Sequence, residues 1–183
     1  YPNYKPLAAG ADRSKLPDTG TPPDAKFPTV QKTELSNGLK VYVAERKSVP
    51  VVNFSLLVDA GFAADQSGIP GTASLAMSMM DEGTKTKDAL QITEELQNLG
   101  ATLNTSANLD MATVSLSALK SNLDPSLAIF SDVILNPSFP ENELERLRKQ
   151  KMIQFQQEKA SPLQMGLRVV PRLIYGENHA YGL

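Results

Sequence analysis

Apolar residues recur at every second position in three stretches of the chain, which predicts three β-strands. These stretches are residues 39–44, 52–58 and 111–119, and a fourth strand is expected at 101–107. A period of two sends successive side chains to opposite faces of a strand, so that one face can be buried. In 111–119 the second face carries Thr113, Ser115 and Ser117. The pattern is typical of an antiparallel sheet with one face against helices and a more polar second face.

The tripeptide Ser36-Asn37-Gly38 precedes the first of these strands and predicts a hairpin turn. Asn-Gly tolerates the positive φ angles that a type I′ turn needs. We therefore expect a type I′ hairpin, followed by a half-buried strand with Leu39, Val41 and Val43 on one face.

Helical spacing of apolar residues predicts helices between and after the strands. Segment 71–83 is apolar or small on nearly every side, which is typical of a helix buried between layers, and Gly83 is expected to close it. The next helix is expected to begin at a Thr86 cap and to end at Gly100. Its predicted buried stripe consists of Ala89, Ile92, Leu96 and Leu99.

Two further helices are expected after the last strand. Asp124 and Pro125 predict the cap and first turn of one, which should stop at Asn136-Pro137. Its predicted buried side consists of Leu127, Phe130 and Ile134. A long charged helix is expected from about 141 to 159, with its charges on a solvated face. Its apolar side chains gather on one side, at Leu144, Leu147, Met152 and Phe155.

Residues 1–28 are rich in proline and show no apolar periodicity, which predicts a linker. The linker is either a disordered tail or an ordered strap on a neighbouring domain, and it indicates that another part of the polypeptide precedes it. We expect the folded domain to occupy residues 29–183, which is enough chain to bury a sizeable core.

The composition argues against several kinds of partner and site. The net charge of −2 gives no reason to expect nucleic acid or an anionic membrane, and no apolar run approaches the ~20 residues that span a bilayer. One His, His179, and no Cys cannot build a typical zinc site, and His179 is expected to be structural. An all-oxygen Ca²⁺ or Mg²⁺ site stays open, although no loop has EF-hand spacing.

Segment 71–84 resembles the zinc helix of the pitrilysin/insulinase family of peptidases, which reads G-x-A-H-x-x-E-H-M-x-x-x-G-T. The framework positions match at Gly71, Ala73, Met79, Gly83 and Thr84. In the family the two His bind zinc and the Glu activates water. Here Ser74 and Ser78 stand at the His positions, and Met77 stands at the position of the general base.

The charged helix carries a second part of the resemblance. The family reads E-x-E-R-E-R-x-x-V-x-x-E, and residues 143–148 match its opening. The position of the third zinc ligand falls on Gln154, 76 residues after Ser78, and a supporting Glu of the family is replaced by Leu147. Two helical turns separate Leu147 from Gln154, so the two residues share a face.

The resemblance implies an α+β fold of the mitochondrial processing peptidase-like metallohydrolase type. Its sheet is mixed but mostly antiparallel and is covered by helices on one side. The family domain has further strands and helices, so the chain is expected to be a truncated version of it. The resemblance also implies that the polar sheet face lines a peptide chamber, whereas a solvent-exposed face is the simpler alternative.

We therefore expect an inactive domain of a zinc metalloendopeptidase that helps to close the chamber and to bind extended peptide. No catalytic residue, metal ligand or cofactor is expected in this chain; zinc is expected in a catalytic sister domain of the same polypeptide or in a partner subunit. The alternative is a purely structural relative, similar to processing-peptidase or respiratory-complex core proteins. An enzyme with Ser74 or Ser78 as its nucleophile is disfavoured, because no His or Lys base accompanies them. A bacterial protein is expected, and the periplasm is favoured over the cytoplasm.

Overall fold

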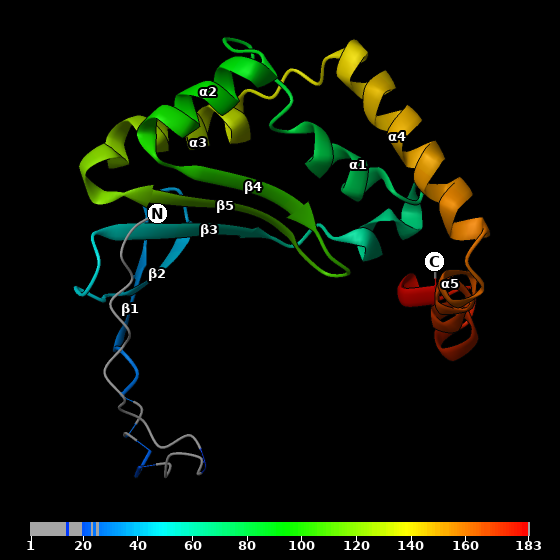
Figure 1. Cartoon of the computed structure of the whole chain (residues 1–183), viewed down its shortest axis with the longest axis horizontal. Helices are drawn as coiled ribbons and strands as arrows, with labels where there is room; N and C mark the ends of the chain where they lie inside the picture. Colours follow the sequence, from blue (N-terminus) through cyan, green and yellow to red (C-terminus); the bar gives the residue numbers. More distant parts are fainter. Residues whose placement is uncertain (1–13, 15–19, 23, 25, 183) are drawn as a thin grey trace. The chain divides into compact units, whose positions relative to one another are not determined.

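The computed structural model describes residues 14, 20–22, 24 and 26–182, so most of the predicted linker at 1–28 lies outside the described residues. The chain divides into two compact units, 1–48 and 49–183 (Figure 1).

The first unit contains an antiparallel hairpin of β1 (Val30–Glu34) and β2 (Lys40–Ala44). The predicted hairpin is confirmed, but the type I′ turn is wrong. Gly38 donates its N–H to the carbonyl of Leu35 at 2.9 Å, and in this turn only Gly38 has a positive φ, of 84°. This is a type I turn followed by a left-handed glycine, so Asn37 needs no strained backbone. The expected half-burial is also wrong, because β2 is largely exposed.

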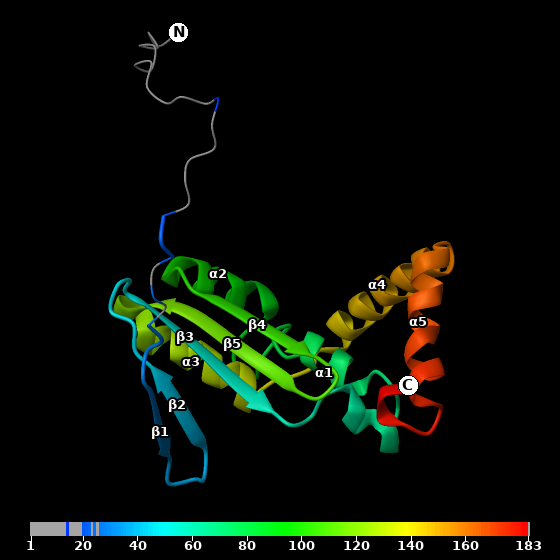
Figure 2. The ribbon, with the colours of Figure 1, turned by 90° about the horizontal axis from the view of Figure 1, so that it is seen from below.

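The second unit is built on an antiparallel sheet with the strand order β3-β5-β4. Its strands are β3 (Val51–Val58), β4 (Thr102–Ala107) and β5 (Ala112–Leu119). Helices α1 (Thr72–Met79), α2 (Ala89–Leu99) and α3 (Leu123–Leu135) cover one face (Figure 1). Figure 2 shows the opposite face, over which no described helix of this unit lies. The predicted α+β architecture is therefore confirmed.

The alternation that predicted the sheet is visible in its central strand. The apolar positions of β5 are buried, and Thr113, Ser115 and Ser117 on the other face are only partly covered. The register places Ser115 opposite Ser55 of β3 and Asn104 of β4. The open face of the sheet is therefore polar at its centre, as predicted.

Helix α1 is half-buried or buried from Ala73 onward, as expected of a helix between layers. Its predicted end is wrong, because the helix ends at Met79 and Gly83 lies beyond it. A glycine is needed at position 83 because the side chains of Ser138 and Pro140 pack closely against its backbone: a Cβ there would come within 3.0 Å of both.

Helix α2 confirms the predicted stripe and the predicted stop. Gly100 adopts the left-handed conformation with φ of 62°, and Ile92 and Leu96 are buried. The predicted Thr86 cap is wrong, since Asp88 caps the helix through a capping box with Gln91. Thr86 instead donates its hydroxyl to Asp132 of α3 at 2.8 Å.

Helix α3 begins two residues earlier than predicted, because its cap is Asn122 and not Asp124. A 3-10 turn, η2 (Lys120–Asn122), leads directly into it, so Asp124 falls in the first turn and is not the cap. The buried side is centred on Ser126, Ile129 and Val133, while the predicted residues Leu127, Phe130 and Ile134 lie half-buried beside it. The helix stops at Asn136, as expected.

Helix α4 (Glu141–Lys159) matches its predicted bounds, but its apolar side is not buried; Met152 and Phe155 are exposed.

A further helix, α5 (Pro162–Tyr175), was not predicted, because Gly166 and Pro171 interrupt its pattern. The short turns η1 (Phe62–Ser67) and η3 (Ala180–Gly182) complete the chain. Within the described residues, no helix is both long and apolar enough to cross a membrane.

The core lies between the covered face of the sheet and the three helices. One cluster joins α2 and α3 to the centre of the sheet, and its largest members are Ile92, Leu96, Leu103, Leu116, Ile129 and Val133. A second cluster packs Met77 of α1 against Ala112 and Val114 of β5. The sheet therefore positions α1, which carries the resemblance described above.

The core predicts that two residues of α2 differ sharply in what they contribute to the free energy of unfolding. Ile92 is 2% exposed and Leu90 is 66% exposed. Ile92→Ala should lower the free energy of unfolding by about 2–5 kcal/mol, because it removes buried surface and leaves a cavity. The matched control Leu90→Ala should change it by less than about 0.5 kcal/mol. Urea denaturation monitored by circular dichroism measures both, and equal losses would contradict this account of the core.

Candidate functional site

The N-terminus of α1 is held by a carboxylate from the preceding turn. Asp65 of η1 accepts a hydrogen bond from Gly71 N–H at 2.9 Å and another from Ala73 N–H at 3.1 Å. Its side chain is buried, and Gly71 has a positive φ of 94°. Asp65 therefore serves as a remote cap, because it satisfies N–H groups that the first turn of a helix leaves free. The loop sequence alone did not identify it.

The three positions of α1 at which a replacement is expected, Ser74, Met77 and Ser78, do not form one polar group. Ser78 donates its hydroxyl to the carbonyl of Ser74 at 2.8 Å, so this hydroxyl is used within the helix. Met77 is buried and packs against Ala112 and Val114 of the sheet. Both serines are half-buried. Two hydroxyls and a thioether offer none of the imidazole, thiolate or carboxylate groups that zinc prefers, so the residues of this helix do not fit the metal.

A partly buried carboxyl follows α1 on the side of β4. Thr105 of β4 donates to Asp81 at 3.5 Å. Burial raises the pKa of Asp81 above its usual range, and the neighbouring charge of Glu82 acts in the same direction. A carboxyl with a raised pKa destabilises the fold when it is ionised, so this penalty is relieved as the pH falls through the folded pKa toward the lower pKa of the unfolded chain.

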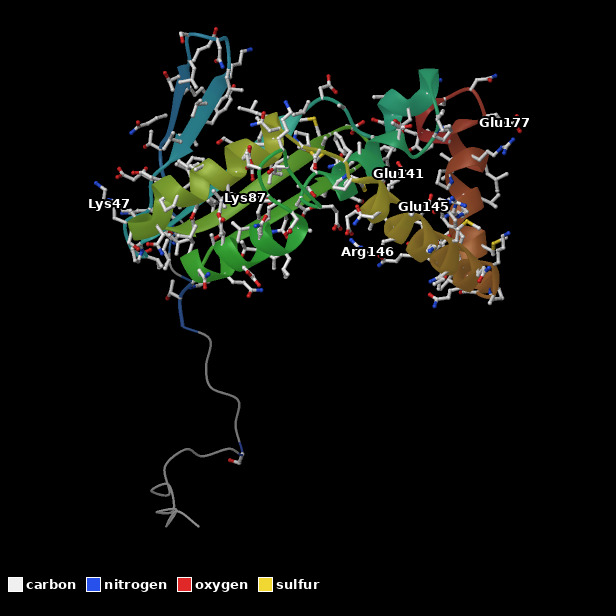
Figure 3. The ribbon with its side chains drawn as sticks, turned by 90° about the horizontal axis from the view of Figure 1, so that it is seen from above. Lys47, Lys87, Glu141, Glu145, Arg146 and Glu177 are labelled. Carbon is white, nitrogen blue, oxygen red and sulfur yellow. The ribbon has the colours of Figure 1, made fainter. Side chains whose placement is uncertain are left out.

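An ion-pair network joins the end of α1 to α4. Arg146 of α4 donates to Glu82 at 2.5 Å and to Glu143 at 2.6 Å, and Figure 3 marks Arg146 on this helix. The hydrogen bonds to Glu143 and Glu82 raise the pKa of the Arg146 guanidinium. The network holds the first turns of α4 beside the segment that follows α1.

The other two positions at which a replacement is expected, Leu147 and Gln154, lie on α4. Leu147 is half-buried, one residue after Arg146. Gln154 is exposed and donates to Glu158 of the same helix at 3.2 Å. The structure thus brings the two helices together near Glu82, and among the described residues no hydrogen bond joins Gln154 to α1. An exposed amide also does not fit the role of a zinc ligand.

The only His of the chain has contacts of its own near the C-terminus. Tyr181 donates its N–H to His179 Nδ1 at 3.1 Å, and the His179 ring stacks on Tyr175 with centroids 5.3 Å apart. Tyr181 also donates its hydroxyl to Asp110 in the β4–β5 turn, which raises the pKa of the phenol. Across the part of the chain that the structure describes, no three His, Cys, Asp or Glu side chains gather as a metal site would require.

The sequence profile of Insulinase (Peptidase family M16) matches residues 40–177. The match contains the sheet, α1, α4 and the full length of α5. The chain therefore belongs to the insulinase family of peptidases, and the resemblance seen in α1 and α4 is confirmed at the level of the family.

Curated relatives cover more than half of the chain. The rat mitochondrial-processing peptidase subunit beta is 30% identical over 144 residues, which are 79% of this chain and 29% of the rat protein. A protein of Rickettsia bellii described as an uncharacterized zinc protease is 29% identical over 62% of this chain and 28% of its own length. The chain thus spans less than a third of the length of these relatives.

Solved structures agree with the family assignment. A peptidase M16 inactive domain from Pseudomonas fluorescens is 31% identical, with a TM-score of 0.80 over 84% of this chain and 37% of that chain. A protease from Helicobacter pylori has the same fold, with a TM-score of 0.69 at 21% identity over 85% of this chain and 38% of that one. The similarity to the Pseudomonas fluorescens inactive domain supports a peptidase-like domain without catalysis.

The remote cap predicts a local effect on α1. Asp65→Ala should lower the free energy of unfolding by about 0.5–2 kcal/mol, because the N–H groups of Gly71 and Ala73 lose their acceptor. Asp59→Ala is the matched control, since Asp59 is an exposed aspartate just before the same loop, and it should change stability by less than about 0.5 kcal/mol. Hydrogen exchange should show faster exchange in α1 for the first variant only. Unchanged exchange there would contradict the capping role.

The expected replacements lead to a prediction about zinc binding when the family's zinc residues are introduced into this chain. We expect the combined variant Ser74→His, Met77→Glu, Ser78→His and Gln154→Glu to bind zinc weakly and to remain without peptidase activity. Supporting residues of the family site, such as the Glu replaced by Leu147, would still be missing, and they tune affinity by roughly 10–100-fold. Dialysis against zinc followed by metal counting measures this. Zinc content equal to that of the unaltered chain would contradict this prediction.

Proposed function

We propose that this chain is a non-catalytic domain of a zinc metalloendopeptidase. The observation that carries the proposal is the coincidence of a preserved helical framework with unsuitable side chains at all five zinc-related positions. These positions are Ser74, Met77, Ser78, Leu147 and Gln154. Membership in the insulinase family and the likeness to an inactive domain support the same function.

The proposed role is to help form a chamber and to hold extended peptide. The open face of the sheet supports this role, because its central positions carry hydroxyls and amides and no charge, as at Ser55, Asn104 and Ser115. Strand β4 lies at the edge of the three-stranded sheet. An edge strand has free N–H and C=O groups, which can pair with an extended peptide.

Catalysis and zinc are proposed to reside in a sister domain of the same polypeptide or in a partner subunit. The relatives support a divided arrangement, since the rat protein is named as a subunit and the Pseudomonas fluorescens domain as inactive. The location of this chain in the bacterial periplasm stays a prediction.

The alternative is a purely structural or assembly role. The bovine cytochrome b-c1 complex subunit 1 favours it, at 25% identity over 66% of this chain. The sequence of the parent protein separates the two functions. An intact His-x-x-Glu-His in the parent or its partner subunit supports the peptidase domain, and its absence supports the structural role.

Reconstitution tests the proposed function. The catalytic partner and this chain are purified separately, and hydrolysis of an unstructured peptide is measured for each and for the mixture. This chain alone should neither cleave peptide nor retain zinc after dialysis, and the mixture should exceed the catalytic partner alone by about tenfold or more in kcat/KM. Stoichiometric zinc in this chain, or full activity of the partner without it, would overturn the proposal.

A further inference from the structure

The turn of the β1–β2 hairpin contains a chemically reactive pair of residues. Asn37 is directly followed by Gly38, and it is the only Asn of the chain that precedes a glycine. Both residues are exposed to solvent, and Figure 2 shows the connection between the two strands at one end of the hairpin. Asn is among the chemically labile residues of proteins. The function proposed above uses neither residue.

The nucleophile for the side-chain amide of Asn37 is the backbone nitrogen of Gly38. When this nitrogen bonds to Cγ of Asn37, the bond from Cγ to Nδ2 breaks, and the proton of the nitrogen leaves with the departing ammonia. The product is a cyclic imide, a succinimide. Water from the solvent then opens the ring at either carbonyl and yields aspartate or isoaspartate. The closure is favoured because both groups belong to one short segment and Gly38 has no side chain to obstruct the approach.

The folded turn opposes this reaction through two hydrogen bonds. Gly38 donates its N–H to the carbonyl of Leu35 at 2.9 Å, so the proton that the nucleophile must lose is in use. Leu39 donates its N–H to Asn37 Oδ1 at 3.1 Å, which holds the side-chain amide toward Leu39. The type I turn also fixes the backbone torsions of Asn37, whereas ring closure requires a rotation about them. The turn must therefore open before the ring can close.

The hairpin that maintains this turn has little support within its own unit. Every residue of β1 is exposed, and β1 and β2 form a two-stranded sheet. A two-stranded hairpin by itself is at most marginally stable in water. Lys32 lies opposite Tyr42, and its ammonium group is 5.5 Å from the centroid of the Tyr42 ring. This cation–π contact favours the closed hairpin.

We propose that Asn37 is a site of spontaneous deamidation through a succinimide, and that the β1–β2 hairpin sets the rate by holding the turn closed. Isoaspartate adds one carbon to the main chain before Gly38, so the turn and the register that pairs Glu34 with Lys40 cannot form again unchanged. Both products replace a neutral amide by a carboxylate. The reaction needs only the hairpin and water, so it is independent of the proposed function.

Peptide mapping of the full-length polypeptide tests the chemistry. The protein is incubated at mildly alkaline pH in native buffer and in concentrated urea, and the peptide that contains residue 37 is quantified by chromatography and mass spectrometry. We expect more isoaspartate than aspartate, and a rate in urea at least about tenfold above the rate in native buffer, because local opening limits the native reaction. The control Asn37→Gln should stay unmodified, since its longer side chain closes a less favourable ring.

Two results of this measurement would overturn the proposal. Aspartate without isoaspartate would exclude the cyclic imide, because ring opening at both carbonyls yields both products. Equal rates in native buffer and in urea would exclude control by the hairpin.

The variant Tyr42→Gly tests separately whether the hairpin sets the rate. It removes the contact with Lys32 and a residue favourable to strands, so the native rate should rise by about fivefold, or to the rate in urea if the hairpin is lost entirely. The rate in urea should not change, because residue 42 lies outside the reacting pair. The matched control Phe27→Gly removes an aromatic side chain that is 89% exposed and precedes β1. It should change the native rate by less than about twofold. Equal native rates for the two variants would contradict control by the hairpin.

Discussion

Helix α1 depends on carboxylates at both of its ends. Asp65 satisfies the N–H groups of Gly71 and Ala73 before the first turn, and Glu82 binds Arg146 just after the last one. The energy comes mainly from burial, because Met77 and Met79 are enclosed while the Arg146 pair is partly exposed and such pairs contribute about 0–1 kcal/mol. The carboxylates determine where the helix starts and which helix lies next to it.

This arrangement explains why the framework positions of the family motif in α1 are occupied as they are. The glycines and the methionine of the α1 motif have structural uses in this chain: Gly71 takes a left-handed backbone, Met79 fills the core, and Gly83 admits Ser138 and Pro140. None of these uses requires a metal. Serine at 74 and 78 is compatible with this packing, because both side chains are only half-buried.

The sequence predicted the sheet and most helices because their signals are local. The period of two in β5 and the stripe of α2 each follow from side chains close in sequence. The cap of α2 was harder to place, since Thr86 and Asp88 are both acceptable N-caps. The capping box between Asp88 and Gln91 selects Asp88, and the hydroxyl of Thr86 is used in a hydrogen bond to Asp132 of α3. Helix α5 was missed because Pro171 argues against a helix when its neighbours are unknown. The positions of Ser74 and Gln154 on their helices could be counted from the sequence, but the Glu82–Arg146 contact that joins these helices spans 64 residues and needs the fold.

The hydrogen bond between Tyr181 and Asp110 has a mechanical consequence. It connects residues 71 positions apart, and it anchors the end of the α4–α5 hairpin to the turn between β4 and β5. The Arg146 network fixes the other end of the same hairpin. A helical hairpin held at both ends cannot move independently of the sheet, so a displacement of α5 is transmitted to the turn between β4 and β5.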